Sequence, residues 1–242
     1  MSEVSLVVTS CGRLDLLEQT MRSFLAFNRY PIRKAILVED SADADTYARV
    51  RVDFADMFDE VLCNDPKKGQ IASIDHAYAH VDTPYIFHCE DDWLFLRGGF
   101  IEESLSVLER DPSLITVWLR ELWDTNKHRI ERDIHYTPKG VMYRNVAVED
   151  ELDWHGFTFN PGLRRLSDYQ RIQPFTAVGH EYEINKRYWE LGYHAAILER
   201  GAVEHLGHRR SERKKELGQD RRRASQRLKA WWRRQRSRAR PD

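Results

Sequence analysis

Cysteine is scarce in this sequence. Cys11, Cys63 and Cys89 are the only three, each in or beside a predicted strand, and no Cys-x-x-Cys motif occurs. An odd number of thiols without such a motif does not suggest a disulfide framework. We therefore expect a reducing compartment, the cytoplasm, and no disulfide bonds.

Long apolar runs are also missing. The chain begins Met-Ser-Glu, and its first apolar run, Val4 to Val8, is far too short for a signal peptide. No stretch approaches the roughly 20 apolar residues that a membrane-spanning helix needs. With 242 residues, 41% of them apolar and 32% charged, the composition is that of a soluble globular protein with a sizeable core.

The net charge of −1 conceals an uneven distribution. Residues 209–242 contain 15 Lys/Arg against four Asp/Glu, whereas the preceding residues contain 23 Lys/Arg against 35 Asp/Glu. We expect an acidic globular domain over 1–208, with a first half over 1–97 and a second half over 98–208. A basic tail follows over 209–242.

Strands and helices alternate in the first half of the chain. Short apolar runs predict strands at 4–9, 35–38, 60–63 and 85–90, and apolar residues at helical spacing predict helices over 14–25, 43–54 and 71–81. This alternation favours βαβ units and an α/β fold with a mostly parallel central sheet.

Polar residues follow the predicted strands at their carboxyl ends, where ligands bind in parallel sheets. They are Thr9, Ser10, Asp40, Glu90, Asp91 and Asp92. Three consecutive carboxylates repel one another when buried, so they suggest a divalent cation that holds a phosphorylated ligand. A solvated acidic loop is the alternative, and the convergence of the strand ends favours the cation.

The second half of the chain is less regular. We expect strands at 114–119, 155–159 and 195–198 and a helix over 180–191, with one strand near 141–146 inside an irregular segment, 120–153. The turn Asn160-Pro161-Gly162 with the following arginines is interpreted either as part of the acceptor site or as a simple tight turn.

Several motifs, in this order and spacing, resemble those of the family 2 inverting nucleotide-sugar glycosyltransferases, which have the GT-A fold. They are the strand and turn 7–13, Val38-Glu39-Asp40-Ser41, the helix after Gly69, Glu90-Asp91-Asp92, Gly179 to Ile184, and His205. The resemblance covers roughly 4–208 and implies a Rossmann-like α/β/α sandwich. It departs from the family at Asp75, where Asn is usual, and at His180, where an acid is usual.

The resemblance implies a metal site and a donor site. Asp92 and His205 would bind Mn²⁺ or Mg²⁺, with His208 as the rival of His205. Asp91 would hold the ribose or a metal-bound water, and Glu90 would orient the loop. Thr9, Ser10, Arg13, Asp40 and Lys68 would contact a UDP- or GDP-linked sugar, although Arg13 also fits an exposed helix start and Lys68 a solvated turn.

The resemblance also implies a base and an acceptor site. Glu181 would remove the proton of the acceptor hydroxyl, with Glu183 as the alternate, although both also suit the start of a helix. Trp93 or Trp154 would line the cleft on the acceptor side, near Asn160.

The basic tail suggests what kind of partner the protein binds. Residues 211–240 are predicted to form a strongly basic helix with a thin apolar stripe that includes Trp231-Trp232. Such a helix suits the anionic inner face of a membrane and, less well, nucleic acid. A solvated tail is the third alternative. We expect transfer of a sugar to a glycan or lipid-linked acceptor. A sugar-phosphate nucleotidyltransferase, whose Gly-rich first loop is missing here, and a non-catalytic nucleotide-sugar or membrane-binding module are the alternatives.

Overall fold

A five-stranded sheet in the order β3-β2-β1-β4-β9 forms the centre of the fold. The computed structural model describes residues 3–125, 127–148 and 155–206, all within one unit, Met1–Leu206. The strands of this sheet are β1 (Val4–Ser10), β2 (Lys34–Glu39), β3 (Glu60–Cys63), β4 (Tyr85–Glu90) and β9 (Gly162–Arg165). The predicted strands of the first half are therefore confirmed.

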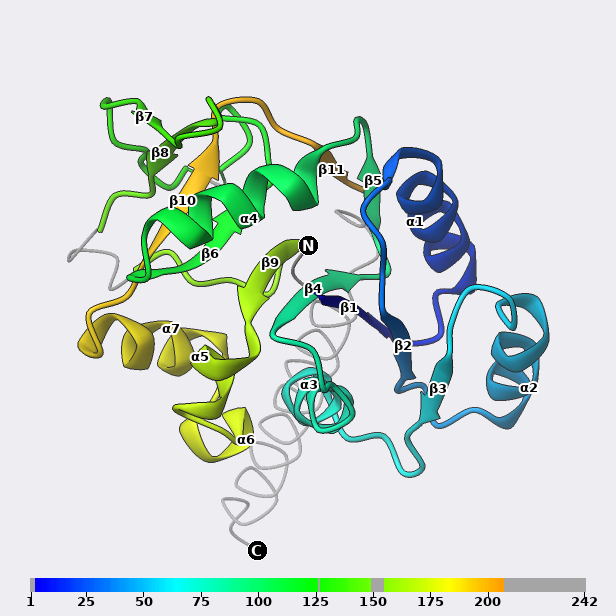
Figure 1. Cartoon of the computed structure of the whole chain (residues 1–242). Coiled ribbons are helices and arrows are strands. Elements are labelled where there is room, and N and C mark those ends of the chain that lie inside the picture. Colours follow the sequence, from blue (N-terminus) through cyan, green and yellow to red (C-terminus); the bar gives the residue numbers. More distant parts are fainter. Residues whose placement is uncertain (1–2, 126, 149–154, 207–242) are drawn as a thin grey trace, which may run out of the picture. The chain divides into compact units, whose positions relative to one another are not determined.

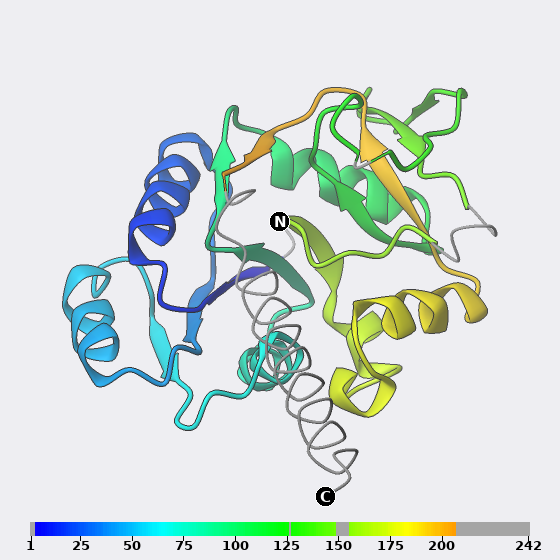
Figure 2. The same ribbon diagram turned by 180° about the vertical axis from the view of Figure 1, so that it is seen from behind.

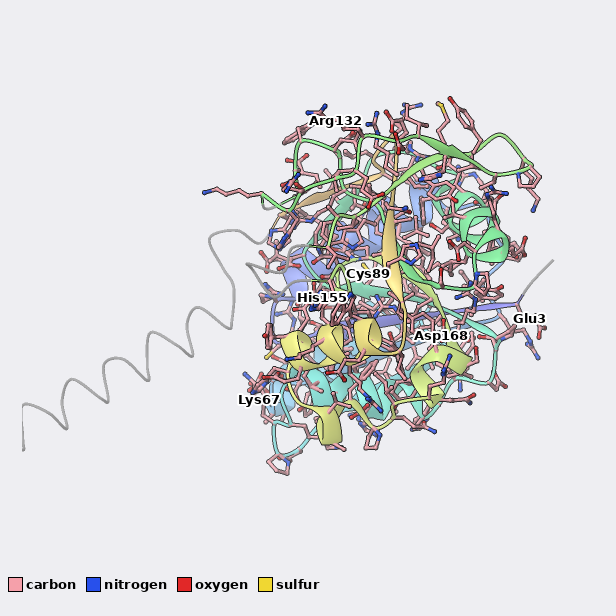
Figure 3. All side chains as sticks on the ribbon, turned by 90° about the vertical axis from the view of Figure 1, so that its left-hand side faces the viewer. Glu3, Lys67, Cys89, Arg132, His155 and Asp168 are labelled. Carbon is pink, nitrogen blue, oxygen red and sulfur yellow. The ribbon has the colours of Figure 1, made fainter. Side chains whose placement is uncertain are left out.

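The first four of these strands run parallel, with β1 between β2 and β4. Their carboxyl ends consequently lie along one edge of the sheet. Figure 3 shows the two edges from the side: Glu3, just before β1, lies on the right, and Lys67, in the loop after β3, lies on the left. The strand β9 closes the sheet antiparallel to β4.

Helices cover both faces of the sheet (Figure 1). The helices α1 (Leu14–Phe27), α2 (Ala44–Asp53) and α4 (Phe100–Arg110) pack on the face that carries Leu6 and Val8 of β1. On the face that carries Val7 lie α3 (Gln70–Tyr78), α5 (Leu166–Gln170), α6 (Phe175–Val178) and α7 (Glu181–Glu190). Side chains of a strand alternate between faces, so successive apolar residues of the central strands join two different apolar cores. The α/β/α sandwich is confirmed.

Two smaller sheets complete the described chain. One has the order β6-β10-β8-β7, built from β6 (Leu114–Trp118), β7 (His135–Tyr136), β8 (Met142–Asn145) and β10 (His194–Leu198). The other pairs β5 (Trp93–Phe95) with β11 (Val203–His205), and Figure 2 shows this pair beside α1. The segment 120–153 thus contributes β7 and β8 to a sheet.

The prediction of a strand at 155–159 is wrong. No strand forms there; β9, a few residues later, takes the place beside β4. Phe157 and Phe159 are buried among the aromatic residues between the sheet and α7, and the Phe157 N–H donates to Asn185 Oδ1 at 2.8 Å. The alternation of apolar residues therefore reflects burial of an irregular segment.

Within the described residues, no helix is both long enough and apolar enough to span a bilayer.

Candidate functional site

The candidate site lies where β1, β2 and β4 end. The register pairs Thr9 with Val38 of β2 and with Glu90 of β4, so the residues that follow these strands lie side by side. The predicted polar edge is buried, so it is not a solvated acidic loop. Its buried members are Thr9, Ser10, Asp40, Asp91 and Asp92.

Arg13 joins the two aspartates of the acidic triplet. Its Nε donates to Asp91 Oδ2 at 3.1 Å, its Nη2 donates to Asp91 Oδ1, and its Nη1 donates to Asp92 Oδ2 at 2.7 Å. The Asp91 side chain is fully buried. The two-point contact with Asp91 is the fork geometry that makes arginine a strong partner of carboxylates. Of the two interpretations of Arg13, the exposed helix start is wrong.

The pKa values of the three carboxylates are shifted in different directions. Burial raises the pKa of Asp91 to about 7, although the Arg13 guanidinium opposes the rise. Burial also raises the pKa of Glu90 to about 8, and the carboxylates of Asp92 and Glu181 add to it. Asp92 differs: burial raises its pKa, but the hydrogen bond with His205 and the charge of Arg13 outweigh burial and lower it. Asp92 is therefore the member of the triplet that is most readily ionised.

His205 reaches Asp92 through the pairing of β11 with β5. The register places His205 opposite Trp93, and the Leu206 N–H donates to the Asp92 carbonyl oxygen at 2.8 Å. His205 Nε2 lies 3.5 Å from Asp92 Oδ2. A carboxylate oxygen and an imidazole nitrogen that face each other fit two ligands of Mn²⁺ or Mg²⁺. Among the described residues no group of three His, Cys, Asp or Glu side chains is placed to hold a metal, so other ligands would come from a substrate and water.

Trp93 cannot line the cleft as expected, because its side chain is 0% exposed. The Arg120 guanidinium carbon lies 4.7 Å from the centre of the indole, and the His205 ring packs against it at 4.8 Å. The indole Nε1 donates to Glu90 Oε2 at 3.4 Å. Trp93 therefore helps to fix the positions of Arg120, His205 and Glu90, which all contact its indole.

Arg120 is a site residue that sequence reasoning missed. It follows β6, is buried, and its Nη1 donates to Asp124 Oδ1 at 3.1 Å. Burial lowers its pKa, while the charges of Asp124 and Glu90 oppose the change. No motif in the sequence identifies a lone arginine after a strand, so only its tertiary position beside Trp93 reveals it.

Asp40 holds the loop between β3 and α3. Its Oδ1 accepts hydrogen bonds from the Lys68 N–H at 2.8 Å and from Asn64 Nδ2 at 2.9 Å, and its Oδ2 accepts one from the Gly69 N–H at 2.8 Å. The Lys68 backbone thus lies at the site, while its Nζ lies 3.4 Å from His76 Nδ1. A further hydrogen bond from a nucleotide base to Asp40 stays a prediction.

The two candidate bases are placed differently. Glu181 Oε1 accepts a hydrogen bond from the Phe159 N–H at 3.1 Å, and its charge contributes to the raised pKa of Glu90. Glu183 instead accepts a hydrogen bond from the His180 N–H at 2.8 Å in a capping box at the start of α7. The helix-start interpretation therefore suits Glu183, and Glu181 is the carboxylate near the triplet.

The remaining predicted residues lie at the margin of the described structure. The Asn160 N–H donates to Thr158 Oγ1 at 3.3 Å, in the segment that precedes β9. Trp154, His208 and the basic tail lie outside the described residues. Their predicted roles stay predictions.

The parallel sheet, with the acidic triplet at its carboxyl edge and the β5–β11 pair that brings a histidine to this triplet, has the GT-A fold. The same fold occurs in a mannosyltransferase from Pyrobaculum calidifontis, solved with GDP-Man and Mn²⁺, at 16% sequence identity and a TM-score of 0.59 over 80% of this chain and 54% of that one.

Two further solved structures are similar. S. aureus TarS 1–349 has 8% identity and a TM-score of 0.55 over 83% of this chain and 59% of its own. GalNAc-T7, solved with UDP, GalNAc and Mn²⁺, has 10% identity and a TM-score of 0.55 over 85% of this chain and 44% of its own. This chain therefore spans about half the length of these proteins. Its sequence matches no protein-family profile and no curated protein.

Proposed function

We propose that this protein is a metal-dependent, inverting glycosyltransferase of the family 2 type. It transfers a sugar from a UDP- or GDP-linked donor to a hydroxyl of a glycan or lipid-linked acceptor, in the synthesis of cell-envelope polysaccharide or glycolipid. The observation that carries the proposal is the pair of Asp92 Oδ2 and His205 Nε2, 3.5 Å apart at the carboxyl edge of a GT-A sheet. Two of the similar structures were solved with Mn²⁺, which supports a divalent cation.

The donor would lie along the carboxyl edge of the sheet. The base would contact the ends of β1 and β2, near Thr9, Ser10 and Asp40, and the diphosphate would reach Asp92 and His205. Bound there, Mn²⁺ or Mg²⁺ acts as a Lewis acid that stabilises the charge of the leaving diphosphate. Asp91 and Glu90 lie beside this position, and the Arg13 guanidinium, which pairs with Asp91, offsets negative charge there. Residues 1–97 would thus bind the nucleotide, and 98–208 the acceptor.

Glu181 would act as the general base. The Phe159 N–H fixes one of its oxygens at 3.1 Å, which orients the carboxylate. A carboxylate so held can accept the proton of the attacking hydroxyl, a contribution of roughly 10²–10⁴-fold in rate. Direct attack on the anomeric carbon inverts its configuration.

The acceptor side would include Trp123, which is 82% exposed. It lies in a turn closed by a hydrogen bond of 2.9 Å from the Asp124 N–H to the Glu121 carbonyl oxygen, directly after the site residue Arg120. An exposed indole face suits stacking against a sugar ring, because it combines apolar area with a polar edge. Trp154, the residue expected here, remains a second candidate.

The basic tail over 209–242 would bring the enzyme to an anionic membrane surface on the cytoplasmic side, close to a lipid-linked acceptor. Its 15 Lys/Arg against four Asp/Glu support this electrostatic attraction. Flotation with anionic liposomes tests it: a variant that ends at His208 should lose binding, and equal binding with and without the tail would reject the membrane role.

A donor-hydrolysis assay tests the proposed reaction. The protein is incubated with a panel of UDP- and GDP-sugars and Mn²⁺, and release of nucleoside diphosphate is measured with and without chelator. We expect release with one donor and its loss with chelator. Nucleotide binding without release under any metal would instead indicate a non-catalytic binding module.

A thermal-shift panel of nucleotide sugars identifies the donor, because a ligand that binds the folded state raises its stability.

A further inference from the structure

We propose that Arg13 is a built-in counter-cation of the metal site, which leaves Asp92 when the metal ion enters together with the donor diphosphate. The inference rests on the proposed function and concerns the order in which the ligands bind. It assigns Arg13 Nη1 two successive partners: Asp92 in the empty site, and the diphosphate in the occupied one.

A single carboxylate oxygen carries the argument. Asp92 Oδ2 accepts the hydrogen bond from Arg13 Nη1 at 2.7 Å and also lies 3.5 Å from His205 Nε2. The oxygen that faces His205, and would share a metal ion with it, is therefore already bonded to a guanidinium. The Arg13 side chain is only 13% exposed, so water screens its charge poorly.

A metal ion and the guanidinium would compete for this oxygen. Two positive groups on one carboxylate oxygen repel each other, and the repulsion grows as water is excluded. Metal entry at Asp92 and His205 therefore requires Arg13 Nη1 to move off Oδ2. The guanidinium would keep its contact with Asp91 but lose Asp92, and it would then lie beside the metal ion in a poorly screened position, which is unfavourable. The aspartate site alone should bind divalent cations weakly.

A nucleoside diphosphate removes this penalty. Phosphate oxygens accept the same two-point hydrogen bonds from a guanidinium as a carboxylate does. A diphosphate that arrives with the metal would give Arg13 its new partner and free Asp92 Oδ2 for the ion. Metal and diphosphate should consequently strengthen each other's binding by the same factor, because such coupling is reciprocal.

The backbone around Arg13 is fixed, so only the side chain needs to move. Its carbonyl oxygen accepts the N–H groups of Leu16 and Leu17 at 2.9 and 3.0 Å at the start of α1. The preceding Gly12, at φ +68°, donates its N–H to the buried Glu39 at 2.7 Å. Arg13 thus has a rigid attachment and a side chain of the length needed to exchange one anion for another.

Mn²⁺ binding tests the inference, measured by electron paramagnetic resonance of the free ion. For the natural protein we expect weak binding of Mn²⁺ alone and binding about tenfold tighter or more when UDP or GDP is present. Arg13→Met should bind Mn²⁺ alone at least about tenfold more tightly than the natural protein, with a smaller effect of nucleotide. Arg22→Met, an exposed arginine of α1 paired with Glu18, is the matched control and should behave like the natural protein.

A second variant covers the risk that Arg13→Met does not fold. Arg13→Lys keeps the charge but cannot bridge both aspartates, so its affinity for Mn²⁺ alone should lie between the other two. If both Arg13 variants bind Mn²⁺ alone no more tightly than the natural protein, the inference is wrong while the proposed metal site stands. If no protein binds Mn²⁺ even with UDP or GDP, the metal-dependent function itself is rejected.

Discussion

Trp93 and His205 face each other across the β5–β11 pair, with their ring centroids 4.8 Å apart and their planes at 67°. The pairing explains how a fully buried tryptophan contributes to the proposed metal site. The indole fixes the position of the imidazole on one side and supports the Arg120 guanidinium on its face, 4.7 Å from the ring centre. An imidazole and a guanidinium of the candidate site thus pack against the same indole.

Replacing this indole should weaken both the fold and the metal site. We expect Trp93→Ala to lower the free energy of unfolding by about 3–5 kcal/mol, the usual cost of emptying a buried tryptophan position. Trp93→Phe keeps an aromatic ring and should cost less while still lowering Mn²⁺ affinity in the presence of nucleotide. Urea unfolding and Mn²⁺ titration measure the two effects. The control is Trp123→Ala, which should change stability by less than about 0.5 kcal/mol because Trp123 is exposed.

Substitutions of Glu181 and Glu183 should have different effects, the first on sugar transfer and the second on stability. Glu181→Gln keeps an oxygen for the Phe159 N–H but cannot take a proton, so donor binding should persist while transfer falls by roughly 10²–10⁴-fold. Glu183→Ala removes the capping box and should cost about 0.5–2 kcal/mol of stability with transfer within a few-fold. Donor affinity by calorimetry and single-turnover transfer distinguish them. Near-normal transfer by Glu181→Gln would move the base elsewhere.

Asp75 should matter for stability. Its carboxylate accepts the N–H groups of Phe175 at 2.8 Å and Thr176 at 2.9 Å and the Tyr169 hydroxyl at 2.9 Å. It therefore ties α3 to the start of α6, and Asp75→Ala should lower the unfolding free energy by about 2–3 kcal/mol. Asp45→Ala, at an exposed position of α2, is the control. Equal unfolding curves for the two variants would contradict this role.

His88 should make the fold sensitive to acid. The ring is 0% exposed in β4, its Nδ1 lies 3.2 Å from the Tyr78 hydroxyl, and burial with the nearby Arg164 charge holds its pKa well below the ordinary value. Below about pH 6.5 the unfolded chain then binds a proton that the folded protein does not. Stability should fall by up to about 1.4 kcal/mol per pH unit as the pH decreases through this range.

The variant His88→Phe isolates this contribution. It removes the titrating group, so the difference in unfolding free energy between the natural protein and the variant should be constant above about pH 7. Below that pH the natural protein should lose stability faster than the variant. Denaturant titrations between pH 5 and 8 measure both slopes, and parallel slopes would show that His88 does not titrate as its environment implies.

The parts of this protein that follow local rules could be predicted from its sequence. The βαβ alternation gave the parallel sheet, and the rule that parallel strands end at one edge brought Asp40 and Asp92 to that edge. The strand β9 was missed because Gly162–Arg165 contains one apolar residue among two arginines and a glycine. Its partner β4 makes it a strand, which is a tertiary effect.

The site residues that were missed or misjudged depend on similar long-range contacts. Trp93 was expected to line the cleft because an indole beside carboxylates suits a sugar, yet the sequence carries no sign that β11 covers it. Arg120 becomes a site residue because the chain at 201–203 packs against the turn after β6, with the Ala202 N–H donating to the Leu119 carbonyl oxygen at 2.7 Å. Such contacts join distant segments and leave no pattern in either one.

The pairing of β11 with β5 has a consequence for the synthesis of the protein. Asp92 emerges from the ribosome early, together with the strands that form the nucleotide edge, whereas His205 belongs to the last described strand. Because chains emerge from the N-terminus, the parallel sheet can begin to form before β11 exists. The growing chain therefore acquires the proposed nucleotide edge before it acquires both proposed metal ligands, and metal binding at this site would have to await the return of the chain to β5.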